Sequence, residues 1–276
     1  MKFFLANFQI IGVFMPIHSP ISLCDLTQHE FDMLDKVVMR HAYAAQNKLG
    51  RLFDERIYEN EMARTLREAG HHVYSQVPVT IRNGEFQMIY YLDLVVDHML
   101  YEIKTVSAFA PEHEAQALHY AMLMNIRRAK LLNFRLERVH GKLCFNRLAE
   151  ADRHRPAFDT TRWTPDTEDC DRLRQRLQEV VSDWGTHLST GLYTEALVHF
   201  CGGEEYCQRR IPVEGLGTHS IRSHAPGMTF LLTSLTRGIE DYHSHLCRLV
   251  SHMDLLGVQW FNFNHSVVEC TTVVKR

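Results

Sequence analysis

Two acidic residues and a lysine stand close together in an apolar stretch of the sequence, where they could act jointly on a metal ion or a phosphate. Eight residues separate Asp93 from Glu102, and Lys104 follows two positions later. The β-branched and aromatic residues around Asp97-His98 predict a β-hairpin with a two-residue turn. Pairing across that turn puts Asp93 opposite Glu102, and side-chain alternation puts Lys104 on the face of Glu102.

The predicted pair of carboxylates needs compensation. Facing Cβ atoms in a sheet lie about 5 Å apart. Two ionised carboxylates at that distance repel by about 3 kcal/mol at an effective dielectric constant near 20. We therefore expect a proton, the lysine or a metal ion between them. Taken alone, the three residues also fit a structural ion pair at the rim of a sheet.

The elements that must position these residues follow from caps, periodicity and turns. Thr27 and Glu30 form a capping box, which predicts a helix that Gly50 ends. Asn83-Gly84 predicts a second hairpin turn. We expect the remaining elements of the first half to be helices at 54–69 and 111–125 and strands at 72–81, 86–96, 99–106, 129–135 and 140–146.

The second half of the chain repeats this pattern weakly. Gly185 and Tyr193 lie 135 residues after Gly50 and Tyr58. We predict an internal duplication separated by a Pro- and Asp-rich linker. The expected parts are an N-terminal extension at 1–26, a first domain at 27–150, a linker at 151–172 and a degenerate repeat at 173–276. The acidic residues do not recur, because Leu231 and Thr233 stand where Glu102 and Lys104 would map.

The spacing Asp-x8-Glu-x-Lys resembles the core of the PD-(D/E)xK nuclease superfamily. Glu55-Arg56-Ile57-Tyr58 on the preceding helix and Gln116-Ala117-Leu118-His119-Tyr120 on the following one strengthen the resemblance, the latter resembling the Q-x-x-x-Y motif of RecB-type nucleases. Together they resemble the bacterial family named for its G-x-x-E-x-x-Y signature, although Leu52 replaces its glycine. The resemblance implies a restriction-endonuclease-like α/β fold, a mixed sheet flanked by helices, here followed by a degenerate copy.

The resemblance also implies an activity and a metal. Asp93, Glu102, Glu55 and the carbonyl of Ile103 would hold Mg²⁺, or Mn²⁺, which accept oxygen ligands. Lys104 would orient or help deprotonate the attacking water and stabilise charge.

Two residues of the later helix complete the implied site. Gln116 would hold the lysine or a phosphate. Tyr120 would pack beside the site.

The expected activity is phosphodiester hydrolysis, so the expected partner is a nucleic acid. We expect this nucleic acid to be DNA. The net charge of −3 provides no general attraction to nucleic acid, so binding needs a local patch, for which Arg127, Arg128 and Lys130 are candidates. A solvated rim is the alternative interpretation of this basic run. A non-catalytic nucleic-acid- or protein-binding module on the same fold also stays open. The fused repeat predicts a pseudo-dimeric monomer, with a homodimer as the alternative.

The setting of the protein is expected to be cytoplasmic and away from membranes. The seven cysteines are scattered and form no C-x-x-C motif, which favours a reducing compartment. Phe3–Met15 resembles the apolar region of a signal peptide but lacks an A-x-A cleavage site and is too short to span a bilayer. We therefore favour an upstream start codon, with Met15 as the true beginning.

Overall fold

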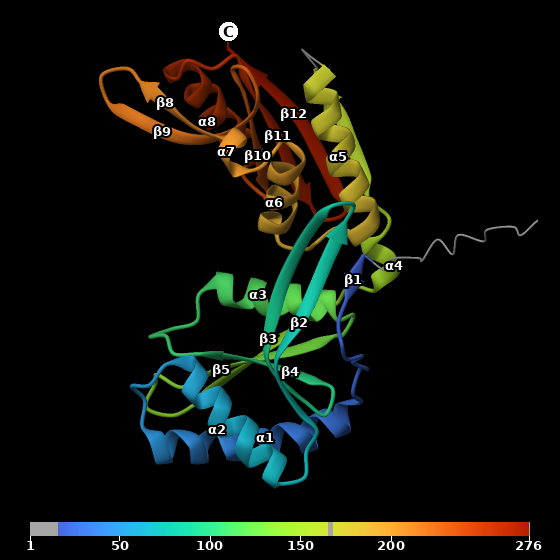
Figure 1. Ribbon diagram of the computed structural model, residues 1–276, viewed down its shortest axis with the longest axis vertical. Coiled ribbons are helices and arrows are strands. Elements are labelled where there is room, and N and C mark those ends of the chain that lie inside the picture. The colour runs from blue at the N-terminus through green and yellow to red at the C-terminus, as the bar shows by residue number, and fades with distance from the viewer. Residues whose placement is uncertain (1–15, 165–167, 276) are drawn as a thin grey trace, which may run out of the picture.

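The chain forms two α/β lobes that lie one above the other (Figure 1). The computed structural model describes residues 16–164 and 168–275. The N-terminal stretch at 3–15, with the expected start at Met15, lies outside the described residues. Each lobe is built on a mixed six-stranded sheet, in the orders β1-β2-β3-β4-β5-β6 and β7-β12-β11-β10-β9-β8.

The first lobe has the mixed sheet flanked by helices that the sequence predicts. In chain order its elements are β1 (Ile17–His18), α1 (Gln28–Leu49), α2 (Glu55–Glu68), β2 (Val73–Asn83), β3 (Phe86–Val96), β4 (Met99–Lys104), α3 (Pro111–Leu123), β5 (Arg128–Asn133) and β6 (His140–Phe145). Strands β4 and β5 are parallel, and their neighbours are antiparallel. The chain therefore needs a crossover between β4 and β5, and α3 provides it.

Alternation along the strands places one helical layer on each face of this sheet. Leu94, Val96 and Tyr101 pack in the apolar cluster that contains α1 and α2. Val95 and Leu100 pack in the cluster that contains α3. Glu102 and Lys104 share the parity of Leu100, so they lie on the α3 face.

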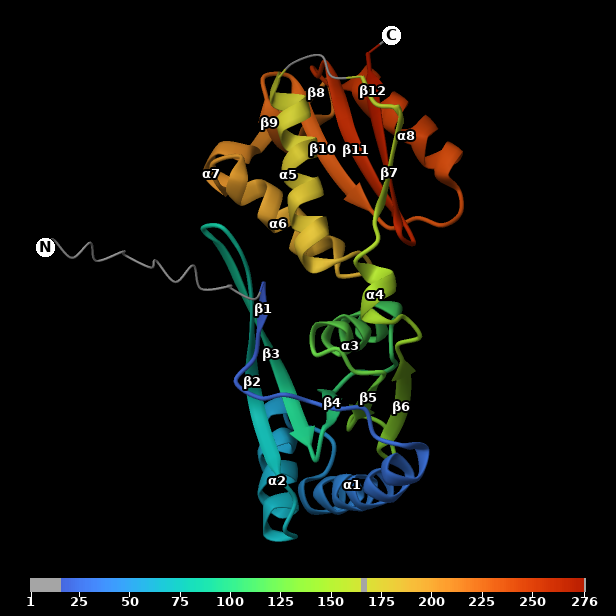
Figure 2. The ribbon, with the colours of Figure 1, turned by 90° about the vertical axis from the view of Figure 1, so that its right-hand side faces the viewer.

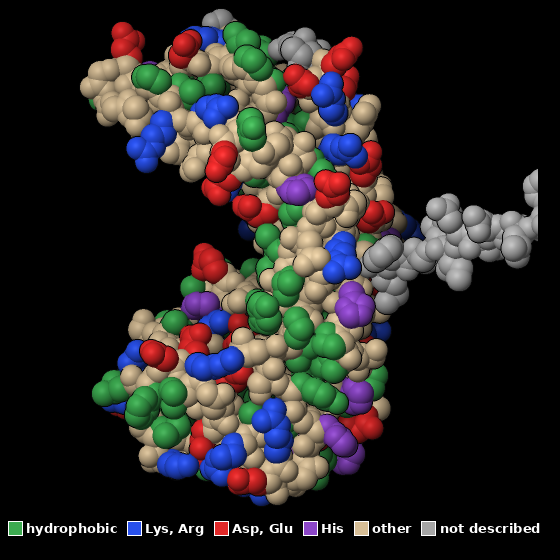
Figure 3. All heavy atoms as spheres, viewed as in Figure 1, with side chains coloured by type: hydrophobic (Ala, Val, Ile, Leu, Met, Phe, Trp, Pro, Cys, Tyr) green, Lys and Arg blue, Asp and Glu red, His purple; other side chains and the backbone are tan. Residues whose placement is uncertain are grey.

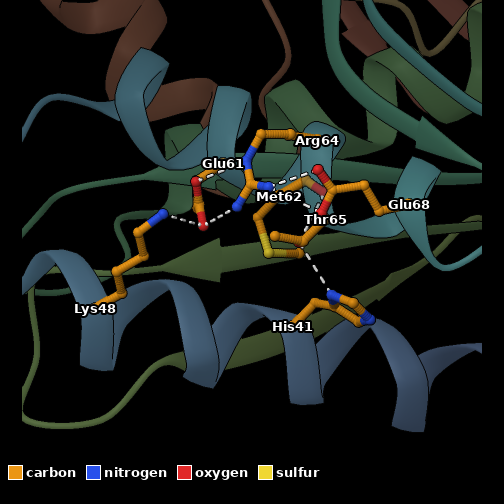
Figure 4. A network of polar contacts seen from close by, with 7 residues as sticks. All are labelled: His41, Lys48, Glu61, Met62, Arg64, Thr65 and Glu68. Carbon is orange, nitrogen blue, oxygen red and sulfur yellow. Dashed lines mark hydrogen bonds and ion pairs between the residues drawn. The ribbon is translucent and has the colours of Figure 1, made fainter.

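An ion pair joins α1 to α2, and further ion pairs run along α2 (Figure 4). Glu61 accepts from Lys48 of α1 at 2.9 Å and from Arg64 at 2.8 Å. Arg64 also pairs with Glu68 one turn later, and His41 Nδ1 contacts Thr65 Oγ1 at 3.0 Å. These contacts lie at the exposed boundary of α1 and α2, whose buried side chains share one apolar cluster, and α2 carries Glu55 at its first turn.

The second lobe has the same order of helices and strands. After α4 (Glu150–Arg153) and β7 (Ala157–Arg162) come α5 (Glu168–Trp184), α6 (Thr190–Phe200), α7 (Glu204–Cys207), β8 (Gln208–Val213), β9 (Gly217–Ala225), β10 (Met228–Thr233), α8 (Ile239–His252), β11 (Gly257–Asn264) and β12 (Val267–Val274). Strands β10 and β11 are parallel, like β4 and β5, and α8 crosses between them. The short helix α7 and the position of strand β7 differ from the first lobe.

Individual contacts recur in both lobes. Tyr58 Oη donates to the Gly50 carbonyl at 2.7 Å, and Tyr193 Oη donates to the Gly185 carbonyl at 2.5 Å. Tyr58 stacks on Phe134 with ring centroids 4.4 Å apart, and Tyr193 stacks on Phe263 with ring centroids 4.7 Å apart. The same side-chain contacts thus hold the first turn of α2 and of α6.

The predicted linker at 151–172 contains regular structure. Strand β7 pairs with β12 in parallel and extends the second sheet, and α5 begins at Glu168. The Pro- and Asp-rich composition of this stretch reflects short elements with exposed faces, since β7 is almost entirely exposed. The N-terminal extension likewise joins a sheet, because β1 pairs with β2.

Contacts between the lobes include those made by the β2–β3 hairpin tip and by α4. The tip of the β2–β3 hairpin reaches α5 and α6 of the second lobe, as both ribbon views show (Figures 1 and 2). There Trp184 Nε1 donates to the Arg82 carbonyl at 2.9 Å, and its ring packs near Phe86. Nearby, the buried Arg153 of α4 donates to three carbonyls, those of Met122 in α3 at 2.7 Å, Trp184 at 2.9 Å and Thr186 at 3.3 Å. Within the described residues no helix is long and apolar enough to cross a bilayer.

Candidate active site

The hairpin of β3 and β4 has the register that the sequence predicts. Val96 pairs with Met99, and Leu94 pairs with Tyr101. Asp97 and His98 form the turn, both with positive φ, as a two-residue hairpin turn requires. The regular pairing ends at Leu94, and Asp93 bonds instead to the backbone of the opposite strand. Its Oδ2 accepts from the Ile103 N–H at 2.9 Å.

Glu102 and Lys104 form a buried pair beside Asp93. Lys104 Nζ donates to Glu102 Oε1 at 2.7 Å, and Glu102 is only 2% exposed. The other carboxylate oxygen, Oε2, is buried without a hydrogen-bond partner among the described residues. A buried acceptor left unpaired is costly, so this oxygen indicates a missing ligand or proton.

The pKa values of the pair also indicate that the carboxylates lack full charge compensation. Burial, followed by the negative charge of Asp93, raises the pKa of Glu102 to about 8, although Lys104 opposes the shift. Burial disfavours the charged lysine, but the carboxylates around it, with Glu102 first, outweigh this and raise the pKa of Lys104. The lysine therefore stays protonated at neutral pH, and its single positive charge faces two carboxyl groups.

Glu55 reaches the same strand end from α2. It is the first residue of that helix, and its Oε1 accepts from the Thr105 N–H at 3.0 Å, one residue beyond Lys104. Its charge is among those that raise the pKa of Lys104. The structure thus brings Glu55 to the cluster, as the sequence predicts.

Gln116 and Tyr120 lie one turn apart on α3. Gln116 Nε2 donates to Tyr120 Oη at 3.1 Å. Burial, together with the charges of Glu102 and Asp93, raises the pKa of Tyr120. Both residues lie on α3, the helix that covers the sheet face on which Glu102 and Lys104 lie, so they border the cluster on the helix side.

Glu59 and Gln76 also belong to the site, although no sequence motif marks them. Gln76 Nε2 donates to Glu59 Oε2 at 2.8 Å and to Asp93 Oδ1 at 3.3 Å. Gln76 has φ 50, a left-handed conformation that is unusual for a non-glycine residue within a strand. Burial raises the pKa of Glu59, against the opposing effect of Arg56. A glutamine among strand-forming residues gives no signal of this conformation.

Residues 32–147 match the family described as the PD-(D/E)XK nuclease superfamily. This part of the chain is a PD-(D/E)XK nuclease superfamily domain. The match spans all the cluster residues from Glu55 to Tyr120 and ends before the second lobe. No curated protein and no solved structure matches the chain.

The donors of the PD-(D/E)XK domain fit a divalent cation. The superfamily is typically metal-dependent, and Mg²⁺ is commonly held by one or two carboxylates together with water and substrate phosphate. Asp93, the unpaired Oε2 of Glu102 and the Ile103 carbonyl would hold such an ion. In the described part of the chain, no three or more His, Cys, Asp or Glu side chains are grouped as metal ligands. The fit therefore rests on two carboxylates rather than on a closed protein cage.

The three predicted nucleic-acid-binding residues lie away from the carboxylates. Arg127 and Arg128 stand before and at the start of β5, whereas the parallel register puts Lys104 beside Asn133 at the end of that strand. Lys130 pairs in register with Tyr101, so its side chain lies on the α1 face of the sheet, opposite to that of Glu102. Each is bound by α1 or by the segment before it: Arg127 pairs with Asp25, Arg128 donates to the Leu26 carbonyl, and Lys130 pairs with Asp35.

Arg135 is a basic residue that the fold places beside the end of β4, one residue beyond Lys104. It follows β5, and its Nε donates to the Thr105 carbonyl at 3.4 Å. The sequence shows it only as one member of a basic run.

Proposed function

We propose that the protein is a Mg²⁺-dependent nuclease that hydrolyses phosphodiester bonds, with DNA as the substrate. The observation that carries this proposal is the buried Glu102, whose Oε2 lacks a partner beside Asp93 and Lys104. Bound there, the metal ion would supply positive charge that offsets the carboxylates and polarises a phosphate. The match to the nuclease superfamily supports the same reaction class.

The residues around the phosphate would have different roles. The raised pKa of Lys104 favours stabilisation of developing negative charge over abstraction of a proton. Glu55 would fix the backbone after β4, and the Gln116–Tyr120 pair would border the substrate on the α3 side. Arg135 would contact the phosphate backbone, which would make binding salt-dependent.

A cleavage panel tests the proposal. The full chain is incubated with single-stranded, duplex and branched DNA and with RNA, in Mg²⁺ or Mn²⁺. Glu102→Gln and Lys104→Met should lower the rate by at least about a hundredfold, because each removes charge at the reacting centre. Glu85→Gln, in the exposed β2–β3 turn, is the matched control and should cleave normally. Equal cleavage by all four proteins would overturn the assignment. Binding without cleavage by the wild type would instead favour a non-catalytic module.

We further propose that the second lobe is a degenerate copy of the nuclease domain. The shared order of elements, the parallel β10–β11 pair and the repeated tyrosine contacts support this. Leu231 and Thr233 stand in β10 where Glu102 and Lys104 stand in β4, so the second copy lacks the acidic pair. A monomer built this way would nick one strand. Concerted cutting of both strands by a protein that sediments as a monomer would contradict the idea. Concerted cutting by a protein that sediments as a dimer would instead favour the homodimer.

We further propose membership of one family within the superfamily and a cytoplasmic setting. Glu55-Arg56-Ile57-Tyr58 on α2 and the Gln116–Tyr120 motif on α3 support membership of the family with the G-x-x-E-x-x-Y signature. The scattered cysteines support a reducing, cytoplasmic setting.

A further inference from the structure

A pocket between the two lobes borders the candidate active site. It has a volume of about 740 Å³, within the range of about 300–1,000 Å³ of small-ligand sites. Tyr90 and α3 line it from the first lobe, and the segment at 187–190 and Phe263 line it from the second. The space-filling view shows the molecule hollowed between the lobes (Figure 3). We call this cavity the interlobe pocket.

His119 gives the interlobe pocket an unused hydrogen-bond donor. Its side chain is 3% exposed and lies in the pocket wall. The Ser189 N–H donates to Nδ1 at 3.2 Å, which places the proton of the neutral ring on Nε2. Burial, with a smaller effect of Arg153, lowers the pKa of His119 to about 4, so the ring is neutral at pH 7. Nε2 is buried and has no hydrogen-bond partner among the described residues.

The pocket also offers ring faces and a positive charge. Tyr90, Tyr120 and Phe263 supply aromatic surface. Arg147 lies in the wall, is exposed, and forms no ion pair with any described residue. Aromatic faces stack on nucleobases, and arginine binds phosphate. A nucleotide has both groups, together with base-edge acceptors for a buried N–H donor.

The position of the pocket connects it to the nuclease site. Gln116 and Tyr120 line the pocket from α3, the helix that covers the sheet face on which Glu102 and Lys104 lie. A nucleotide in the pocket would therefore be a near neighbour of the phosphate at the carboxylates. In a duplex a base is stacked and paired, so only an unpaired or extruded nucleotide could enter.

We propose that the interlobe pocket binds one unpaired nucleotide of the nucleic-acid substrate, with His119 Nε2 donating to the base and Arg147 contacting its phosphate. This inference rests on the proposed nuclease function and specifies its substrate. The enzyme would select DNA that presents an unpaired base next to the cleaved bond. The second lobe would contribute directly to this selection, because its segment at 187–190 forms one wall.

Binding without metal tests this proposal separately from cleavage. The full chain is titrated in EDTA with three labelled DNAs: a perfect duplex, the same duplex with one bulged nucleotide, and the same bulge with an abasic residue. We expect the bulged base to bind at least about tenfold more tightly than the abasic bulge, because only the base can accept from His119 and stack. Equal affinity for base and abasic bulge would overturn the proposal, whatever the cleavage panel gives.

Variants locate the binding at the pocket. Arg147→Gln changes an exposed side chain and should weaken binding of the bulged DNA by about tenfold, the value of one charge-assisted hydrogen bond. His119→Phe keeps a ring and removes the donor, and should abolish the preference for base over abasic bulge. Arg155→Gln, another exposed arginine outside the pocket, is the control and should bind like the wild type. Unchanged binding by Arg147→Gln, or a preference retained in a folded His119→Phe, would contradict the assignment.

Free nucleotides distinguish a substrate strand from a small ligand. Deoxyadenosine monophosphate should compete with the bulged DNA only weakly, because it lacks the contacts of the flanking duplex. Competition stronger than that of unlabelled bulged DNA would overturn the assignment to a substrate strand.

Discussion

Glu102→Gln should stabilise the metal-free protein increasingly as the pH rises above about 5. The pKa of Glu102 is raised from 4.5 to about 8 by burial and by Asp93. Between these values the folded protein holds a proton that the unfolded chain releases, so stability falls as the pH rises through this window. The stability that the protein retains while Glu102 is protonated is fully present below about pH 4.5 and is lost by about pH 8.

The magnitude follows from the same interval. One pKa unit is worth about 1.4 kcal/mol, so the rise from 4.5 to about 8 corresponds to about 5 kcal/mol. Glutamine has nearly the same shape, accepts from Lys104 through its carbonyl oxygen and carries no titrating proton. The variant should therefore gain stability over the wild type by up to about 5 kcal/mol between pH 5 and pH 8.

Denaturant unfolding in EDTA at several pH values measures this difference. Saturating Mg²⁺ should restore much of the stability of the wild type at pH 8 and should stabilise Glu102→Gln less, because the variant has lost a charged ligand. Glu85→Gln, an exposed substitution, should follow the wild type at every pH. Wild-type and Glu102→Gln curves that stay parallel within about 1 kcal/mol from pH 5 to pH 8 would refute the argument that this carboxyl is buried without compensation.

Four further substitutions test how the lobes are built. Arg153→Met should lower the free energy of unfolding by about 3 kcal/mol, because three carbonyls lose a buried charged donor. Unfolding in guanidinium chloride measures this loss. A loss below about 1 kcal/mol would show that the lobes do not depend on this contact. Tyr58→Phe and Tyr193→Phe should each cost about 1 kcal/mol in thermal unfolding, since each removes one buried hydrogen bond to a glycine carbonyl, and very unequal losses would argue against equivalent roles in the two lobes. Glu61→Gln should cost less than about 1 kcal/mol, and high salt should abolish the difference from the wild type, because its partners Lys48 and Arg64 are exposed; a salt-independent loss would contradict a surface network.

Local rules were sufficient to predict the hairpin that carries the acidic residues. The turn at Asp97-His98 and the alternation around it depend only on neighbouring residues, and the observed register follows them. The capping box before α1 was predictable for the same reason, since Thr27 and Glu30 bond to each other's backbone.

The rest of the site depends on contacts between distant segments. Gln76 adopts its left-handed conformation where its amide bonds to both Glu59 and Asp93, and no local pattern signals this. The basic run looked suited to a phosphate backbone, but the parallel pairing of β4 and β5 puts its first members at the far end of the strand from Lys104. The sequence marks His119 only as a helix residue, because its contact with Ser189 comes from the other lobe.

The tip of the β2–β3 hairpin has a consequence for anyone who wishes to shorten this protein. Strand β3 carries Asp93 near one end and Phe86, 5% exposed, at the other, where it packs near Trp184 of the second lobe. A fragment that stops after β6 would keep every acidic side chain of the cluster yet present a long, apolar ribbon end to water. Such a fragment should aggregate through that ribbon, so a minimal enzyme would need either the whole chain or polar replacements at the hairpin tip.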